Sequence, residues 1–374
     1  MSPARRRTDL RDPKSFDHVG RDAGANQFVI GRVLADLADK HPDVVAATAD
    51  LKYVTKLAEF EDRHPTRFFQ FGISERNMFS AAAGLASCGL IPYVATFAAF
   101  SGVLGYENIR TDMAYTNLPV RVLGTHCGIS LGFFGTSHHA TEDIAALRAV
   151  ANMTIYSPTD ATSLASLIET TVEHPGPIYF RIGRGAEPEL YATAPGGYGE
   201  DGAHVVASGS EVLIVATGIM VSAARDAAEM LAQRGVSATV VDAYRLKPFP
   251  SDRIARLAAG HRLVVSVEEH NVEGGLGTLV REALAEAGVG IPVFKHGLHD
   301  EFGIVGPPTH LYRYYGLDPV GIGVVVARAV ERTGAGAIDV RAPLWTTADR
   351  EAIQAEQDAR TRSSGSPFLT PVRS

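Results

Sequence analysis

The chain has 374 residues, which at about 100–200 residues per domain predicts two or three domains with buried cores. Its 45% hydrophobic and 21% charged residues are typical of a globular protein and exclude a disordered, collagen-like or coiled-coil chain. Lys and Arg total 35 against 42 Asp and Glu, a net charge of −7, so we expect no nucleic-acid partner. Its two cysteines, Cys88 and Cys127, offer no disulfide framework, and we expect a cytoplasmic protein.

One stretch, from Asn77 to Tyr106, contains no Asp, Glu, Lys or Arg. A membrane-spanning helix needs about 20 apolar residues, but Gly89 and Pro92 would interrupt a helix here. We therefore expect no membrane span, but a helix, a short strand and a second helix, buried in a core or against a subunit. The arginine-rich amino terminus is followed by no apolar run, so we expect no secretory signal.

The predicted elements begin after a flexible tail over residues 1–21. A first unit over residues 22–190 combines strands and helices in alternation. Its predicted strands cover residues 44–47, 67–71, 93–97, 120–123, 153–156 and 177–181. Its predicted helices cover residues 28–38, a segment opening at 75, and residues 100–115, 142–151 and 159–173. Strands alternating with helices predict a mostly parallel sheet covered on both faces.

A Gly- and Pro-rich linker over residues 191–204 leads to a second unit over residues 205–335. Its predicted strands cover residues 212–216, 237–241, 262–267 and 291–295, and its helices 220–234, 250–258, 276–288 and 318–332. Residues 336–374 have weak periodicity, and we expect a largely irregular tail. The predicted fold class is therefore α/β, with two doubly wound domains.

Common nucleotide and metal motifs are absent: no Walker loop, H-E-x-x-H or C-x-x-C occurs. The stretch Gly274–Gly277 begins a predicted helix, whose amides could hold a phosphate. An ordinary strand-to-helix connection is the favoured interpretation. Glu269 and His270, just before it, fit interdomain packing better than chemistry.

Gly72–Met78 follows a predicted strand and enters the uncharged helix. The dipole of that helix would favour an anionic Glu75, and burial would favour its acid form. On the ordinary interpretation, Ser74 caps the helix and Glu75 merely suits its first turn.

Two further clusters follow strand ends. Phe97 and Phe100 are spaced to form one wall of a pocket for a planar ring, although such pairs are more often core. The Gly-rich loop from Thr125 to His139 holds three histidines beyond the carboxyl end of a strand, where ligands bind in open α/β sheets. Because these histidines lack a carboxylate or thiolate at metal-ligand spacing, we expect no metal site.

Together and in this order, the motifs resemble the C-terminal half of transketolases, which depend on thiamine diphosphate. The resemblance rests on Ala49–Leu51, Gly72–Met78, Phe97-x-x-Phe100, Thr125–Glu142, Asp242–Pro248 and Val267–Gly277. It implies a pyrimidine-binding domain over 22–190 and a transketolase C-terminal domain over 205–335. The family's diphosphate-binding domain, with its G-D-G motif and Mg²⁺ ligands, is not in this sequence. The resemblance therefore implies a split transketolase whose partner subunit holds most of the Mg²⁺ contacts, assembled as α2β2.

The resemblance also implies residue roles. Glu75 would hydrogen-bond the cofactor's aminopyrimidine and be catalytic, Phe97 and Phe100 would flank that ring, and Asp50 would bind the cofactor. The residues expected to bind a sugar or sugar-phosphate substrate are His126, His138, Phe134 and Arg181. Among these, His138 would also be catalytic, and His126 and Arg181 would contact phosphate.

This sequence departs from the family pattern at several positions. Gln27 replaces an arginine, Val54 a serine, Val103 an aromatic residue, and Phe134 the aspartate that reads a sugar hydroxyl. Losing a buried hydrogen-bonding partner changes specificity strongly, so we expect a shorter, branched or differently charged ketose. Lys52 or Lys56 could restore lost positive charge.

Three alternatives stay open at this point. They are a β subunit of a 2-oxoacid dehydrogenase, a 1-deoxyxylulose-phosphate synthase-like carboligase, and a non-enzymatic scaffold. The motifs around Glu75 and the histidine loop favour transketolase over the dehydrogenase. The synthase would ordinarily retain the loop aspartate, and a scaffold would have no need to retain Glu75, Phe97 and His126.

Overall fold

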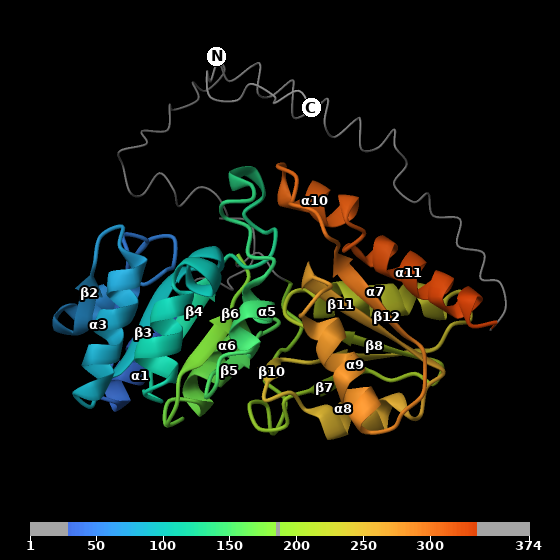
Figure 1. Ribbon diagram of the computed structural model, residues 1–374, viewed down its shortest axis with the longest axis horizontal. Coiled ribbons are helices and arrows are strands. Elements are labelled where there is room, and N and C mark those ends of the chain that lie inside the picture. The colour runs from blue at the N-terminus through green and yellow to red at the C-terminus, as the bar shows by residue number, and fades with distance from the viewer. Residues whose placement is uncertain (1–28, 185–187, 335–374) are drawn as a thin grey trace, which may run out of the picture.

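The computed structural model describes residues 29–184 and 188–334, and the predicted tails over 1–21 and 336–374 lie outside these ranges, as does Gln27. Two α/β units lie side by side, one coloured blue to green and the other yellow to red (Figure 1). Each is a sheet with helices on both faces, as the alternation of elements predicts.

The first unit contains a seven-stranded sheet in the order β10-β5-β6-β4-β3-β1-β2. Its strands are β1 (Val44–Thr48), β2 (Phe68–Gln70), β3 (Ile91–Phe97), β4 (Arg121–Thr125), β5 (Thr154–Tyr156), β6 (Ile178–Arg181) and β10 (Arg245–Lys247). All pairs are parallel except β10 with β5. One face is covered by α1 (Val29–Lys40), α2 (Ala58–Arg63) and α6 (Ala161–Thr170). The other is covered by α3 (Glu75–Ser87), the helical segments after β3 and α5 (Asp143–Arg148).

The uncharged stretch forms the predicted helix, strand and second helical segment. After α3 and β3, the chain winds through the π-helical turns η3 (Phe100–Leu104) and η4 (Ile109–Ala114), with α4 (Tyr106–Asn108) between them. Met78 and Phe79 of α3 are fully buried, whereas Val103 and Leu104 are exposed. In the described part of the chain, no helix is long and apolar enough to cross a membrane.

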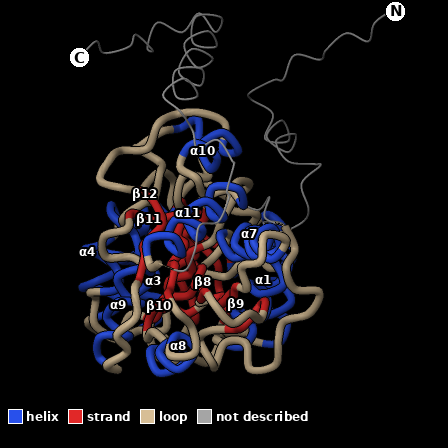
Figure 2. The backbone as a smooth tube through the Cα atoms, turned by 90° about the vertical axis from the view of Figure 1, so that its right-hand side faces the viewer, coloured by secondary structure: helices blue, strands red, loops and turns tan. Residues whose placement is uncertain are grey.

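The second unit contains a five-stranded sheet in the order β12-β11-β8-β9-β7. Its strands are β7 (His204–Ala207), β8 (Val212–Ala216), β9 (Ala238–Asp242), β11 (Leu263–Asn271) and β12 (Val293–Leu298). The helices are α7 (Met220–Ala232), α8 (Ser251–Ala258), α9 (Leu276–Glu286), α10 (Pro308–Tyr314) and α11 (Pro319–Arg332). Helices α7 and α11 pack together on one face, and α8 and α9 on the other. Figure 2 shows the strands at the centre, surrounded by helices.

The structure adds short elements that the sequence pattern does not predict. The three-residue strand β10 leaves the second unit and pairs antiparallel with β5 of the first sheet, with Arg245 opposite Tyr156. Strand β7 pairs antiparallel with β9, and the helices α2 and α10 span only six and seven residues. Segments this short carry too few side chains to establish a period, so tertiary pairing decides their structure.

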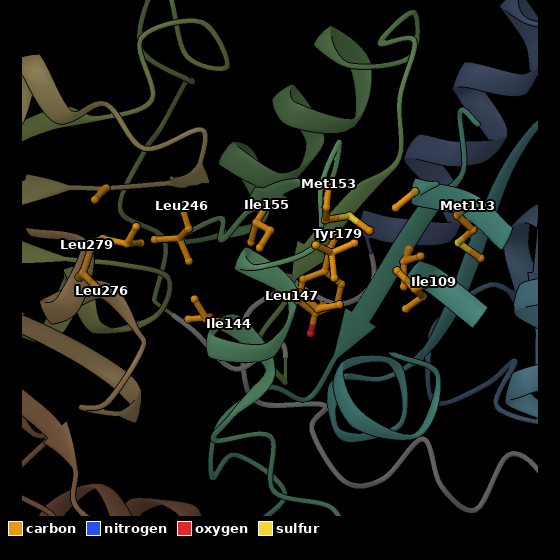
Figure 3. Close-up of a cluster of buried hydrophobic side chains, with 14 of the residues drawn as sticks. Ile109, Met113, Ile144, Leu147, Met153, Ile155, Tyr179, Leu246, Leu276 and Leu279 are labelled. Atoms are coloured by element: carbon orange, nitrogen blue, oxygen red, sulfur yellow. The ribbon is translucent and has the colours of Figure 1, made fainter. Parts of the chain in front are cut away.

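A continuous apolar cluster joins the two units through α5 and β10. Ile144 and Leu147 of α5 and Leu246 of β10 are fully buried between the sheets (Figure 3). Leu276 and Leu279 of α9 extend the cluster into the second unit. Because these side chains share one core, the two units form one packed body, and residues from both can build a single site.

Candidate active site

The carboxyl ends of the parallel strands bring the predicted site residues to one edge of the first sheet. Asp50 follows β1 and is exposed, Phe97 ends β3, and His126 follows β4. Neighbouring parallel strands end at the same edge, and an open α/β sheet binds its ligands there. The order β4-β3-β1 therefore places these three positions on adjacent strands.

Five predicted residues form an aromatic cluster: Phe97, Phe100, His126, Phe134 and His138. The ring centroid of Phe97 lies 5.6 Å from Phe100, 4.9 Å from His126 and 5.8 Å from His138. His138 also contacts Phe100 at 5.3 Å and Phe134 at 5.1 Å. Phe97 is 8% exposed and Phe134 is 61% exposed, so the cluster runs from a buried floor to an open mouth. Such a wall suits a planar ring.

His126 is a buried, neutral member of this cluster. Burial first, and then the positive charges of Arg184 and Lys56, lower its pKa to about 3. Its Nδ1 lies 3.0 Å from the Thr125 hydroxyl, and its backbone has a left-handed φ of 57°. Non-glycine residues hold such a conformation only where the surroundings enforce it, often at functional sites. His126 is thus fixed as a neutral hydrogen-bonding group.

Arg184 is a site residue that the sequence motifs did not reveal. It is partly buried, close enough to His126 to lower its pKa, and its Nη1 lies 3.5 Å from the Ser130 carbonyl. Lys56 is also partly buried and acts on His126 in the same way. Lys52, the other lysine considered, instead forms an ion pair with Glu61. The positive charge near the cluster therefore comes from Arg184 and Lys56.

The geometry does not support the predicted role of Arg181 in phosphate binding. Its side chain is 2% exposed, and its Nε donates to the Asp143 carboxylate at 2.9 Å. Its Nη2 donates to the carbonyls of Ala140 at 3.1 Å and of Glu269 at 2.8 Å. A guanidinium with these buried partners links β6 to α5 and β11, so we do not include it among the substrate contacts.

Glu75 occupies the first turn of α3 and is 7% exposed. Ser74, at the N-cap, makes no side-chain capping bond, contrary to the ordinary interpretation of the motif. Within residues 29–184 and 188–334, the Glu75 carboxylate makes no hydrogen bond or ion pair. A nearly covered carboxylate with no partner in the described chain can accept a hydrogen bond from a ligand.

The Gly274–Gly277 turn is an ordinary connection, and its helix start is occupied from within the chain. The backbone amides of Leu276 and Gly277 donate to the fully buried Glu268 carboxylate at 2.6 and 2.8 Å. Burial raises the pKa of Glu268 to about 7. The N-terminus of α9 is thus satisfied by a side chain of the same unit, where a phosphate would otherwise bind.

Glu269 and His270 connect the units, as the sequence suggested. Glu269 Oε1 accepts from the Ile129 amide at 2.8 Å and from the Tyr312 hydroxyl at 2.6 Å. His270 Nε2 lies 3.9 Å from Asp143 of α5. Among the described residues, no group of three or more His, Cys, Asp or Glu side chains is arranged to hold a metal ion.

Fold and site together define a class of protein: a doubly wound α/β domain with an aromatic cluster at the carboxyl edge of its sheet, joined to a second doubly wound domain. The family model for "Transketolase, pyrimidine binding domain" matches residues 25–189, and the model for "Transketolase, C-terminal domain" matches residues 201–322. The chain belongs to the transketolase family, which implies dependence on thiamine diphosphate.

The similar proteins include subunits of divided transketolases. An apulose-4-phosphate transketolase subunit from Phocaeicola vulgatus is 34% identical, over 77% of this chain and 92% of that protein. A 6-deoxy-6-sulfo-D-fructose transketolase subunit from a Clostridium species is also 34% identical, over 76% and 88%. A solved split-gene transketolase, described as an inactive β4 tetramer, has a TM-score of 0.75 and 37% identity, and the match covers 82% of this chain and 99% of that one.

Proposed function

We propose that this chain is the pyrimidine-binding subunit of a two-chain transketolase, which moves a two-carbon ketol unit from a ketose to an aldose. The observation that carries this proposal is the buried Glu75 carboxylate, which has no partner among the described residues. It follows β2 at the same sheet edge that bears the aromatic cluster. A cofactor's aminopyrimidine placed there would give this carboxylate its missing hydrogen bond.

Each site residue then has a distinct task. Bound thiamine diphosphate supplies the carbon nucleophile and the electron sink for carbon–carbon cleavage. Glu75 holds a proton at the pyrimidine ring nitrogen N1′, and Phe97 and Phe100 flank the ring and exclude water. Asp50, exposed at the end of β1, contributes to the same cofactor site.

The substrate lies toward the open end of the aromatic cluster. His138, partly buried against Phe97 and Phe100, orients the donor's first hydroxyls. Neutral His126 offers a hydrogen bond to the acceptor, and Arg184 and Lys56 attract an anionic group such as phosphate.

The second subunit of the proposed enzyme carries the diphosphate-binding domain with its G-D-G motif, and it holds Mg²⁺. Exposed apolar side chains near Glu75 and along η3 support a covering partner: Ile73 is 85% exposed, Val103 59% and Leu104 50%. The relatives named as transketolase subunits support the same division, and we propose an α2β2 assembly in the cytoplasm.

The test is reconstitution of the full chain with a purified subunit that carries the G-D-G domain. We expect ketol transfer only with both chains, thiamine diphosphate and Mg²⁺ present, and a loss of about 100-fold or more in Glu75→Gln. Glu229→Gln, an exposed change on α7, is the matched control and should retain full activity. Full activity in Glu75→Gln would refute the assignment.

The same reconstituted pair separates the rival activities. Full-length 1-deoxy-D-xylulose-5-phosphate synthases also match, for instance one that is 36% identical, of which this chain spans 47%. Condensation of pyruvate with glyceraldehyde 3-phosphate would favour that activity over ketol transfer. Oxidative decarboxylation of a 2-oxo acid with an artificial electron acceptor would favour the dehydrogenase.

We further propose that Phe134 sets a non-standard sugar specificity. Its ring is 61% exposed at the mouth and contacts His138, where a carboxylate would otherwise accept a hydrogen bond from a sugar hydroxyl. Phe134→Asp should therefore raise kcat/KM for xylulose 5-phosphate with ribose 5-phosphate by about tenfold or more. Phe133→Asp, a neighbouring position that is 55% exposed, is the control. Best turnover of the wild type on this standard pair would contradict the proposal.

A further inference from the structure

A hollow lies in the C-terminal unit, and none of the residues that line it belongs to the aromatic cluster. It has a volume of about 590 Å³ and lies at the outer edge of the second sheet, beside the edge strand β12. Helix α9 borders it from one face of the sheet and α11 from the other. A volume of this size falls within the range of small-molecule sites.

Its apolar floor is formed by one face of α11 together with strand β12. Val325 and Ala329 are one helical turn apart on α11, and Arg328 and Arg332 extend the same face. Phe294 of β12 lies beneath the Arg332 guanidinium, which is 5.4 Å from the ring centroid. The aromatic contact holds this cation at the wall of the hollow.

The charges that line the hollow are strongly unbalanced. Four cations line it, Arg281, Lys295, Arg328 and Arg332, against the single carboxylate of Glu273. The whole chain has a net charge of −7, so this concentration of cations runs against the overall composition. His296 also lines the hollow, and burial lowers its pKa, which keeps it neutral.

The four cations differ in the hydrogen bonds and ion pairs that they already make within the protein. Lys295 donates to the Val272 carbonyl at 2.8 Å and to Glu273 at 2.9 Å, and Arg281 donates to the Val293 carbonyl at 3.0 Å. Arg328 is exposed and makes no hydrogen bond, ion pair or ring contact with any residue in the described ranges. Lys295 uses the carboxylate of Glu273, and among the described residues the remaining positive charge at the hollow has no counterion.

We propose that this hollow, the β12 basic pocket, binds a small polyanion of the phosphorylated-metabolite class, at a site separate from the substrate site. Arg328 and Arg332 supply planar guanidinium forks that bind phosphate through paired hydrogen bonds, and Arg281 and Lys295 add charge at the opposite wall. The apolar floor leaves room for the carbon skeleton of the ligand.

Calorimetric titration of the full chain with inorganic pyrophosphate tests this proposal. We expect saturable binding that weakens as salt is added, and a loss of about tenfold or more in affinity for Arg328→Ala. Glu273→Gln should bind pyrophosphate more tightly, because Glu273 is the one carboxylate among the described residues that lines the hollow and competes for its cations. An increase in affinity on loss of a single acid is not expected from a general unfolding effect.

Two arginine variants locate the site. Arg256→Ala removes an exposed cation from α8 in the same unit and should leave the affinity unchanged. Arg184→Ala removes a cation of the substrate site and should also leave this binding event intact. Absence of saturable binding, or binding abolished by Arg184→Ala and unaffected by Arg328→Ala, would overturn the proposal. The reconstituted pair should bind pyrophosphate in the same way, and loss of binding there would equally count against it.

Discussion

Two glutamates at the starts of helices have opposite surroundings. Glu268 is fully buried and accepts hydrogen bonds from the first amides of α9, at 2.6 and 2.8 Å. Glu75 begins α3, is 7% exposed, and has no hydrogen-bond partner within the described residues. A carboxylate bonded within the protein stabilises the fold, whereas one without a protein partner is available to accept a hydrogen bond from a ligand. This difference is the reason we propose Glu75, and not Glu268, as the functional acid.

The same contrast extends along the carboxyl edges of the two sheets. At the second edge, Glu269 and Asp242 accept from tyrosine hydroxyls and hold loops in place. At the first edge, Asp50, Lys56 and His126 hold left-handed backbone angles of 57–62°. Backbone strain at the first edge, and acids that tie loops together at the second, indicate that the first is built to receive ligands and the second to join the units.

The largest difference in stability is expected between variants of two arginines that lie three residues apart, Arg181 and Arg184. Arg181→Met should destabilise the protein by about 3–5 kcal/mol, because it leaves the fully buried Asp143 carboxylate without its ion pair. Arg184→Met should change stability by less than about 0.5 kcal/mol but raise KM for a phosphorylated substrate. Urea unfolding and steady-state kinetics measure the two effects. A large stability loss in Arg184→Met, with none in Arg181→Met, would reverse our assignment of the two residues.

These arginines also show what the sequence could predict and what it could not. Alternating strands and helices were enough to place the main sheets, and motif order placed Phe97, Phe100, His126 and His138 together. Motif order did not separate Arg181 from Arg184, because both follow an apolar strand. The distinguishing signal is Asp143, an acid that α5 buries against Arg181, and only the packing of α5 onto β6 brings the two together.

Strand β10 is a second feature that the sequence alone does not predict. Its three residues are too few to establish an alternation, and its partner β5 lies about ninety residues earlier in the chain. Nothing local indicates that a segment of the second unit completes the first sheet. The buried Leu246 is the only apolar residue of that strand, and its role as a link between the units depends on Ile144 and Leu276, which other elements supply.

A smaller change in stability is expected for alanine variants of the two glutamates, Glu268 and Glu75. Glu268→Ala leaves the amides of Leu276 and Gly277 buried without an acceptor, and should cost about 1–3 kcal/mol. Glu75→Ala, the same substitution at the other helix, removes no hydrogen bond among the described residues and should cost less or even stabilise the chain. Urea midpoints of the isolated chain measure both. An equal loss in both variants would mean that Glu75 has a structural role after all.

The smallest expected effect is on the pH dependence of stability, through the fully buried Asp242. Its Oδ2 accepts from the Tyr191 and Tyr198 hydroxyls, and burial raises its pKa from 3.8 to about 7. A raised pKa in the folded state means that the folded protein binds the proton more tightly than the unfolded chain. The stability from this group is therefore present below about pH 4 and is lost as pH rises through 7.

Asp242→Asn cannot ionise, so its urea midpoint should fall less between pH 5 and pH 8 than that of the wild type. Asp252→Asn, an exposed change on α8, should leave the wild-type pH dependence unaltered. An unchanged fall in Asp242→Asn would show that this carboxyl is already ionised in the folded protein at pH 5. Asp242 would then be a fixed anion that the two tyrosine hydroxyls stabilise through Oδ2, and not a buried neutral acid.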